Sequence, residues 1–264
     1  MISCFILREV RTGNKNDSYN ELVTAVQQCS KCMTGQETRG VKLVQDSCRS
    51  RINLWSHWQG CLEAKILVIG QDWGEKPDET SNTFWTNDPT YPSLTGVHPQ
   101  ILKHKFKTDN NLADICREAL GLDLKEKQES LFFTNAVLCY RDKGFTGAVN
   151  PDWFRSCQPY CARLIEIIKP KAIVTLGSMP LRALLYRGRL SYDKNFADPD
   201  KKLKISKSMR EIVAATDQLY YRPEESINIY PVVPMYHCGS WGTKARSRDK
   251  HVTDWARLGN YINI

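Results

Sequence analysis

The chain has 264 residues, of which 41% are hydrophobic and 25% charged, a composition typical of a globular protein with one large core. No apolar run approaches the roughly 20 residues that cross a bilayer, so we expect no membrane partner. Thirty-seven Lys and Arg against 29 Asp and Glu give a net charge of +8, which favours a polyanion such as nucleic acid as partner. The N-terminus has no basic flank and no cleavage-site signature, which predicts a cytoplasmic protein.

The N-terminal part of the chain predicts a short helix and then a metal or cluster motif. Ser18, with Glu21 three residues later, forms a capping box that predicts a helix over 19–28. The helix leads into Cys29-Ser30-Lys31-Cys32. Ten cysteines in a chain without a signal peptide predict reduced thiols, some of them metal ligands.

The first strand is expected at 65–69, a continuous apolar run typical of a strand buried on both faces of a parallel sheet. It ends in Gly70-Gln71-Asp72-Trp73-Gly74, and a loop rich in Asp, Asn, Thr and Pro follows over 75–98.

Helices and strands alternate through the rest of the chain. Asn150, Pro151 and Asp152 predict the start of a helix that ends before Pro170. The other elements are expected, in chain order, as a helix at 112–120, strands at 131–135 and 172–176, a charged insertion at 186–226 with one helix near 206–215, a strand at 227–233 and a helix at 252–261.

This alternation predicts an α/β fold, a three-layer α/β/α sandwich around a mostly parallel four-stranded sheet. We expect one domain over 1–264, with a cluster-binding N-terminal region at about 19–60 and the insertion at 186–226. In such sheets the ligand site lies beyond the carboxyl ends of the strands.

Three of the predicted strands end in polar side chains that suit catalysis: Asp72, Asn135 and His237. Each alone has an ordinary structural interpretation, as a turn residue, a loop partner or a hydrogen-bonded histidine. Because carboxyl ends of parallel strands meet at one edge, their joint placement predicts one pocket.

These residues lie in segments that resemble the uracil-DNA glycosylase superfamily, and its family-four branch in particular. Ile69-Gly70-Gln71-Asp72 is similar to motif one, and His237 stands at the histidine of motif two. The stretch 131–139 resembles the family-four strand, and Cys157-Gln158-Pro159-Tyr160 with 166–177 resembles the helix and strand that follow. The resemblance spans about 29–258 and implies a DNA glycosylase.

The resemblance also implies a [4Fe–4S] cluster. Family-four enzymes bind it through a Cys-x-x-Cys near the N-terminus and two later cysteines, which match Cys29, Cys32, Cys139 and Cys157. Four thiolates suit iron–sulfur or zinc equally by softness, so zinc stays the alternative cofactor. Cys161, one turn after Cys157, is a possible substitute ligand.

The resemblance implies a monofunctional mechanism, since no lysine stands at a nucleophile position. His237 is expected to stabilise the departing base anion, and Asp72 the cationic sugar and the attacking water. The residues expected to bind the flipped base are Gln71, Phe84, Trp85 and Asn135.

Departures from the family motifs bear on the substrate. Gly74 stands where uracil-specific enzymes carry the Tyr that closes the C5 side of the base, and the insertion is longer than usual. An open C5 side admits a modified cytosine, such as glucosylated hydroxymethylcytosine of phage DNA, and superfamily members that act on it in phage defence are known. We therefore expect either that base or uracil, in repair.

Contacts to DNA are expected after motif two. Trp241 replaces the leucine that wedges into the base stack, and Lys244, Arg246 and Arg248 are candidate phosphate contacts. A zinc deaminase is excluded because His-x-Glu and Pro-Cys-x-x-Cys are absent. A non-catalytic DNA-binding protein with a structural zinc is the alternative. We expect a monomer with no nucleotide cofactor.

Overall fold

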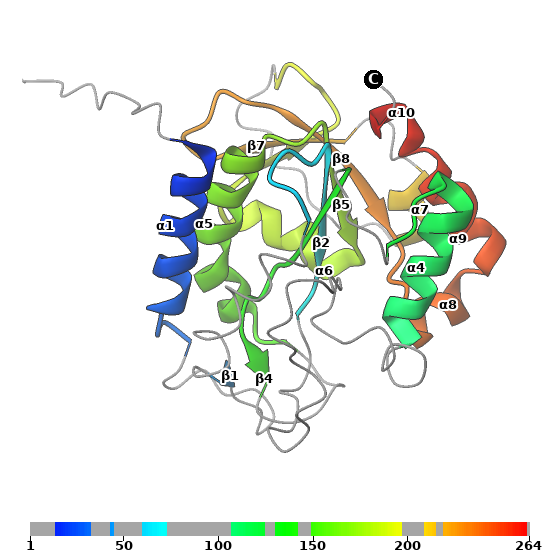
Figure 1. Cartoon of the computed structure of the whole chain (residues 1–264), viewed down its shortest axis with the longest axis horizontal. Coiled ribbons are helices and arrows are strands. Elements are labelled where there is room, and N and C mark those ends of the chain that lie inside the picture. The colour runs from blue at the N-terminus through cyan, green and yellow to red at the C-terminus, as the bar shows by residue number, and fades with distance from the viewer. Residues whose placement is uncertain are drawn as a thin grey trace, which may run out of the picture.

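The computed structural model describes eight segments of the chain, and a mixed sheet lies at their centre (Figure 1). The described segments are 14–32, 43–44, 60–72, 107–124, 130–141, 149–196, 209–214 and 219–262. Phe84, Trp85 and Gly74 lie outside them, as does the whole loop at 75–98.

The central sheet has six strands in the order β3-β2-β5-β8-β7-β6. The first four are parallel, and β7 and β6 run antiparallel to the strands beside them. Their bounds are β2 Ile66–Gly70, β3 Leu131–Asn135, β5 Ala172–Leu176, β6 Gly188–Ser191, β7 Tyr220–Pro223 and β8 Tyr230–Met235. A separate pair joins β1, Leu43–Val44, to β4, Tyr140–Arg141.

Helices cover both faces of the sheet, which confirms the predicted three layers. Alternate residues of β2 show this directly: Leu67 and Ile69 belong to one buried cluster, Ile66 and Val68 to the other. One face carries α1 (Lys15–Gln27), α5 (Pro151–Ile168), α6 (Ser178–Ala183) and the short η1 (Leu184–Tyr186), and α1 lies along α5 in Figure 1. The other carries α4 (Lys107–Leu120), α9 (Arg248–Ala256) and α10 (Gly259–Ile262).

The predicted sheet of four strands is wrong in number, because the charged segment at 186–226 contributes two more. It forms the antiparallel pair β6–β7, and β7 pairs in turn with β8. Of the helix predicted near 206–215, the structure describes 209–214, and these residues are helical as α7, Met209–Ala214. The segment therefore extends the sheet on the β8 side.

Helix ends follow their capping residues. As predicted, Asn150 precedes α5, and its side-chain oxygen accepts the backbone N–H of Asp152 at 2.9 Å. The predicted capping box at Ser18 is wrong. α1 begins one turn earlier, where Asn14 caps it by accepting the N–H of Asn16 at 3.1 Å.

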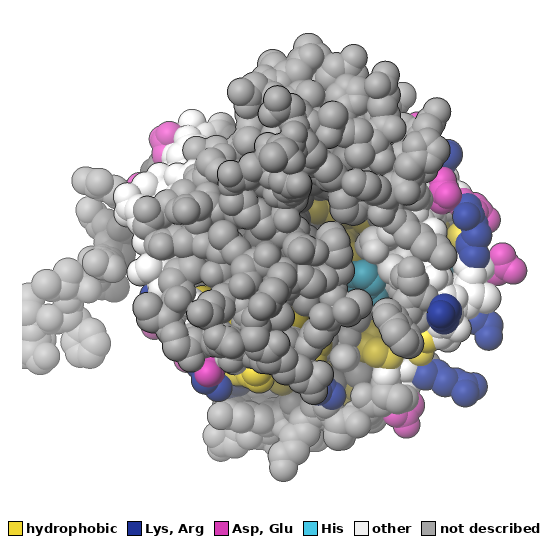
Figure 2. Space-filling model, turned by 90° about the horizontal axis from the view of Figure 1, so that it is seen from below, with side chains coloured by type: hydrophobic (Ala, Val, Ile, Leu, Met, Phe, Trp, Pro, Cys, Tyr) yellow, Lys and Arg dark blue, Asp and Glu magenta, His cyan; other side chains and the backbone are white. Residues whose placement is uncertain are grey.

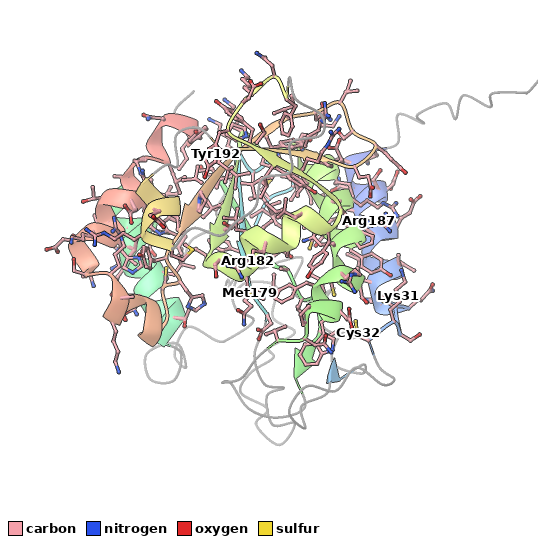
Figure 3. The ribbon with its side chains drawn as sticks, turned by 180° about the vertical axis from the view of Figure 1, so that it is seen from behind. Lys31, Cys32, Met179, Arg182, Arg187 and Tyr192 are labelled. Carbon is pink, nitrogen blue, oxygen red and sulfur yellow. The ribbon has the colours of Figure 1, made fainter. Side chains whose placement is uncertain are left out.

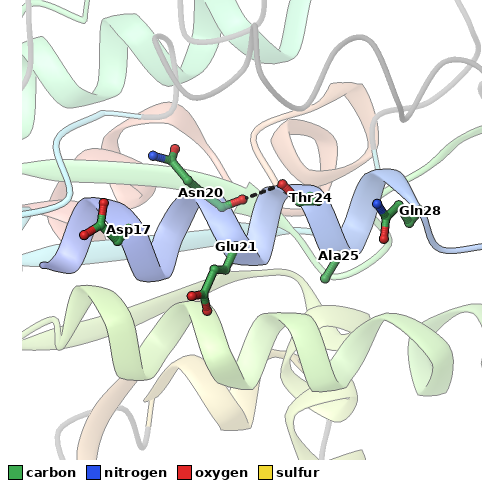
Figure 4. Close-up of a pocket in the computed structure, with 6 residues that line it drawn as sticks. All are labelled: Asp17, Asn20, Glu21, Thr24, Ala25 and Gln28. Carbon is green, nitrogen blue, oxygen red and sulfur yellow. Dashed lines mark hydrogen bonds between the residues drawn. The ribbon is translucent and has the colours of Figure 1, made fainter. Parts of the chain in front are cut away.

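Two further observations concern the outside of the molecule. Across the described residues, no helix is both long enough and apolar enough to cross a membrane. A shallow hollow on α1 is lined only by residues of that helix, and Thr24 donates to the Asn20 carbonyl there at 2.9 Å (Figure 4). Its lining comes from one helix alone, so it is not a candidate active site.

Candidate active site

Polar side chains meet where the four parallel strands end. Gln71 and Asp72 follow β2, Asn135 ends β3, and His237 comes two residues after β8. Since β3, β2, β5 and β8 are neighbours in that order, their carboxyl ends lie side by side. We call this side of the sheet, with Asp72, Asn135 and His237, the carboxyl edge. Figure 2 views the molecule from this side: one histidine side chain is visible, and Lys and Arg side chains lie toward one margin of the same face.

Asn135 is held at this edge by the neighbouring strand. A Cβ atom at Gly70 would lie 2.2 Å from Oδ1 of Asn135, so only glycine leaves room for the amide. The parallel ladder continues past it, since the N–H of Ala136 donates to the Gly70 carbonyl at 2.9 Å. From α5, which packs on the sheet, the Cys161 thiol donates to the backbone carbonyl of Asn135 at 3.6 Å. Asn135 is therefore buried and fixed in place.

Asp72 lies beside both a hydrogen-bond donor and the histidine. Nε2 of Gln71 donates to Oδ2 of Asp72 at 2.8 Å. The carboxylate is near enough to His237 to favour its charged form. Two of the predicted catalytic side chains, on strands that are not adjacent, are thus brought together.

His237 is held as a neutral imidazole with a defined tautomer. Its Nδ1 accepts the backbone N–H of Gly239 at 2.9 Å, so the ring proton is on Nε2. Burial lowers the pKa of His237, Asp72 opposes this shift, and His251 adds to it. The arrangement presents a neutral N–H donor rather than a cation.

The segment after His237 folds back on it as α8, Ser240–Ala245. A Cβ atom at Gly242 would lie 1.6 Å from the His237 carbonyl oxygen, so the helix packs directly on the histidine backbone. Nδ2 of Asn111 in α4 donates to the Cys238 carbonyl at 2.8 Å. Trp241 is the second residue of α8, and its side chain lies outside what the structure describes.

The three predicted phosphate contacts occupy different surroundings. Lys244 is exposed at the end of α8. Arg248 is also exposed but lies 3.0 Å from Glu118. Arg246 is half-buried and binds Asp254 through two nitrogens, one of them at 2.6 Å. Asp254 was not predicted from the sequence, because a partner eight residues away across a helix boundary follows no periodic pattern.

The four predicted ligand cysteines converge beside the same edge; we call them the cysteine group. A hydrogen bond from Cys157 lowers the pKa of the Cys32 thiol to about 7, and the same bond, with burial, raises that of Cys157. Cys139 lies close enough to Cys157 to interact electrostatically, and the Tyr160 hydroxyl donates to Cys29. Figure 3 labels Cys32 just beyond α1.

The other described cysteines have different surroundings. Burial raises the pKa of Cys161 to about 12, and its thiol bonds to Asn135 rather than to the group. Cys116 and Cys238 are buried in the core. No three Cys, His, Asp or Glu side chains in the described segments lie close enough to hold one metal ion. The donor set, four thiols from three segments, suits either zinc or an iron–sulfur cluster by its chemistry.

A mostly parallel sheet with acid, amide and imidazole side chains at the carboxyl ends of its strands defines an α/β protein with a polar candidate site there. Residues 57–257 match the profile of the uracil DNA glycosylase superfamily, and the chain belongs to that superfamily, whose enzymes hydrolyse N-glycosyl bonds. It is also 29% identical over 119 residues to a type-4 uracil-DNA glycosylase of Sulfurisphaera tokodaii, a match that covers 45% of this chain and 42% of that protein.

Proposed function

We propose that the protein is a monofunctional DNA glycosylase that flips a pyrimidine nucleotide out of DNA and hydrolyses its N-glycosidic bond, leaving an abasic site. The observation that carries this proposal is the neutral, Nε2-protonated His237 beside Asp72 at the carboxyl edge of the sheet. Breaking this bond leaves a negative charge on the base and a positive charge on the sugar. The two side chains match those two charges.

His237 acts on the base. As the bond breaks, charge grows on the O2 oxygen of the pyrimidine, and the Nε2–H donor stabilises it. Because burial lowers its pKa, the imidazole stays neutral at physiological pH and donates a hydrogen bond without giving up its proton. The Gly239 N–H fixes this tautomer, so no reorganisation is needed during the reaction.

Asp72 acts on the sugar and the water. A carboxylate stabilises the oxocarbenium-like sugar and orients the water that attacks C1′. Gln71 donates to Oδ2 and so helps to orient the carboxylate toward the sugar and the water. No lysine is assigned a nucleophilic role, so the product is an intact abasic site.

Asn135 reads the base, with Gln71, Phe84 and Trp85 as further base-binding residues. An amide offers both a donor and acceptors, which match the N3 and C4 substituent edge of a pyrimidine. The contact with Gly70 and the Cys161 thiol restrict its movement, so a base with the wrong pattern leaves polar groups unpaired.

We assign the cysteine group to a [4Fe–4S] cluster held by Cys29, Cys32, Cys139 and Cys157, with zinc as the alternative. A single zinc ion requires all its thiolates within about 2.3 Å of one point. In a cubane each thiolate binds its own iron, so the sulfur atoms lie farther apart. The similarity to a type-4 uracil-DNA glycosylase and the buried cysteines at the matching positions support the cluster. When bound, it supplies a structural cross-link between α1 and α5.

The base is either a C5-modified cytosine, such as the glucosylated hydroxymethylcytosine of phage DNA, or uracil. Gly74 in place of a C5-blocking tyrosine favours the modified cytosine and a role in defence against phage. Similarity to a type-4 uracil-DNA glycosylase favours uracil and a role in repair.

One experiment tests both the activity and the base. Anaerobically purified protein is incubated with uracil-containing DNA and, separately, with phage DNA carrying glucosylated hydroxymethylcytosine, and released bases and abasic sites are measured by mass spectrometry. We expect release from one substrate, and none with Asp72→Ala. Tight DNA binding without release from either would instead establish a non-catalytic DNA-binding protein.

A further inference from the structure

An ion pair lies behind the loop that carries His237. Arg246 follows α8 and Asp254 lies in α9, and the guanidinium binds both carboxylate oxygens. The carboxylate side chain is only 6% exposed and that of Arg246 21%, so the pair is shielded from water. Two-point pairs of this kind fix orientation as well as distance.

The same guanidinium also lies on the residue next to the catalytic histidine. Its central carbon lies 5.3 Å from the ring centroid of Tyr236. The imidazole of His251 packs edge-on against the same ring, with centroids 6.3 Å apart. Tyr236 is thus held between a cation and a fully buried imidazole.

His237 is connected to this group from its other side as well. α8 begins just after His237 and ends just before Arg246, so the helix is anchored at one end by the ion pair. Gly242, in the middle of α8, packs on the His237 carbonyl and lies beside the His251 imidazole. A displacement of Arg246 therefore disturbs two contacts of His237: the ring of Tyr236 before it and helix α8 after it.

We propose that Arg246 is a positioning residue for His237, acting through Tyr236 and Asp254, and is not a phosphate contact. This proposal rests on the catalytic role proposed above for His237. A bidentate arginine bound to a buried carboxylate has little capacity left for DNA, whereas Lys244, two residues earlier, is exposed. The surface basic residues and Arg246 thus have different tasks although they are neighbours in sequence.

The proposal predicts a change in rate and in its pH dependence. Two titratable groups face His237 from other elements, Asp72 after β2 and His251 on α9. Replacing Arg246 removes a positive charge that lowers the pKa of His251. The looser loop also admits water to the His237 imidazole and weakens the burial that keeps it neutral. The acid limb of the pH–rate profile then moves to higher pH.

The test compares single-turnover base release by Arg246→Gln with that of Arg187→Gln. Arg187 provides an exposed control, since its ion pair with Glu224, 3.0 Å long, lies where β6 begins and β7 ends (Figure 3). We expect Arg246→Gln to slow release at saturating DNA by about 10- to 100-fold, because displacements of the order of 1 Å cost that much. The acid limb of the pH–rate profile of Arg246→Gln should lie at higher pH than that of the unaltered protein. The salt dependence of its DNA binding should be unchanged.

Two further variants keep the result interpretable. Tyr236→Leu removes the ring but leaves the Arg246–Asp254 pair, so it should fold and still shift the acid limb. Arg246→Lys keeps the charge without the planar fork and should restore only part of the rate.

Different results would contradict the positioning role of Arg246 and the proposed function. If Arg246→Gln instead keeps its rate and pH profile and lowers the salt slope of binding, Arg246 is a phosphate contact and the positioning role is wrong. If His237→Ala releases base as fast as the unaltered protein, the proposed function itself is wrong.

Discussion

The carboxyl edge and the cysteine group are neighbouring regions built in different ways. At the edge, Asp72, Asn135 and His237 each follow a buried strand, and their positions come from the ladder itself and from backbone contacts such as Gly239 N–H to His237. The cysteine group instead joins three segments, with Cys32 and Cys157 far apart in sequence. One helix touches both, since Cys157 meets the group and Cys161 bonds to Asn135.

This difference predicts that the carboxyl edge controls activity and the cysteine group controls stability. A residue placed by a sheet can be lost without changing the sheet, so its removal costs activity. A residue that ties distant segments together contributes to the free energy of unfolding, so its removal costs stability. The predictions below test that division.

The largest effect is expected at the carboxyl edge. His237→Ala and Asp72→Ala should each lower single-turnover base release by at least about a hundred- to a thousand-fold, the usual cost of losing one preorganised charge-stabilising group. DNA affinity and Tm should stay close to those of the unaltered protein, as measured by filter binding and calorimetry. If either variant also has a clearly lower Tm, the carboxyl edge contributes to stability as well as to activity.

The second effect concerns the cysteine group. Cys157→Ala should lose iron and lower Tm by about 10 °C, because losing a cluster costs on the order of 3 kcal/mol and each kcal/mol shifts Tm by about 2–4 °C. The measurements are iron content and calorimetry of anaerobically purified protein. Cys161→Ala is the control and should keep about four irons per chain. Zinc in place of iron would overturn the cluster and leave the catalytic proposal standing.

The third effect is on DNA binding. Lys244→Gln and Arg248→Gln should each reduce the slope of log K against log salt by about 0.9, one phosphate contact. The effect of Arg248 is expected to be the smaller, because its guanidinium also pairs with Glu118. Titrations at several salt concentrations measure both slopes. Unchanged slopes in the double variant would place the DNA on another face.

The smallest effect is expected from pH. Burial lowers the pKa of both His237 and His251, so each binds its proton less readily in the folded chain than in the unfolded one. The contribution of the two neutral imidazoles to the free energy of unfolding is complete above their unfolded pKa of about 6.5. It is lost as the pH falls through their lower pKa in the folded chain. Base release should vary by only about twofold from pH 8 to 6.5 and decline below that. A rate that rises toward acid would mean that the imidazolium is the active form.

Much of the fold followed from hydrophobic pattern alone. Ile66–Gly70, Leu131–Asn135 and Ala172–Leu176 are apolar runs buried on both faces, and each strand was predicted to within a residue. β6 and β7 were missed because Gly-Arg-Leu-Ser and Tyr-Tyr-Arg-Pro are only four residues long and carry polar residues, which gives no clear strand pattern. Only their long-range pairing makes them strands.

The candidate site was predicted in part for the same reason. Asp72, Asn135 and His237 were recognisable because strand ends in a parallel sheet must meet. The pair between Arg246 and Asp254 was not, since a positive charge in a basic sequence gives no sign that its partner is buried. The tautomer of His237 depends on one backbone N–H, which no residue type encodes.

Gly70 has a consequence for changing the specificity of this protein. Its missing side chain and the amide of Asn135 occupy one shared volume, because a Cβ there would lie 2.2 Å from Oδ1. A bulkier residue at 70 would displace the amide of Asn135 unless residue 135 is smaller, so the two positions are coupled. Joint variation of both positions is therefore expected to reshape the pocket for other bases more effectively than variation of residue 135 alone.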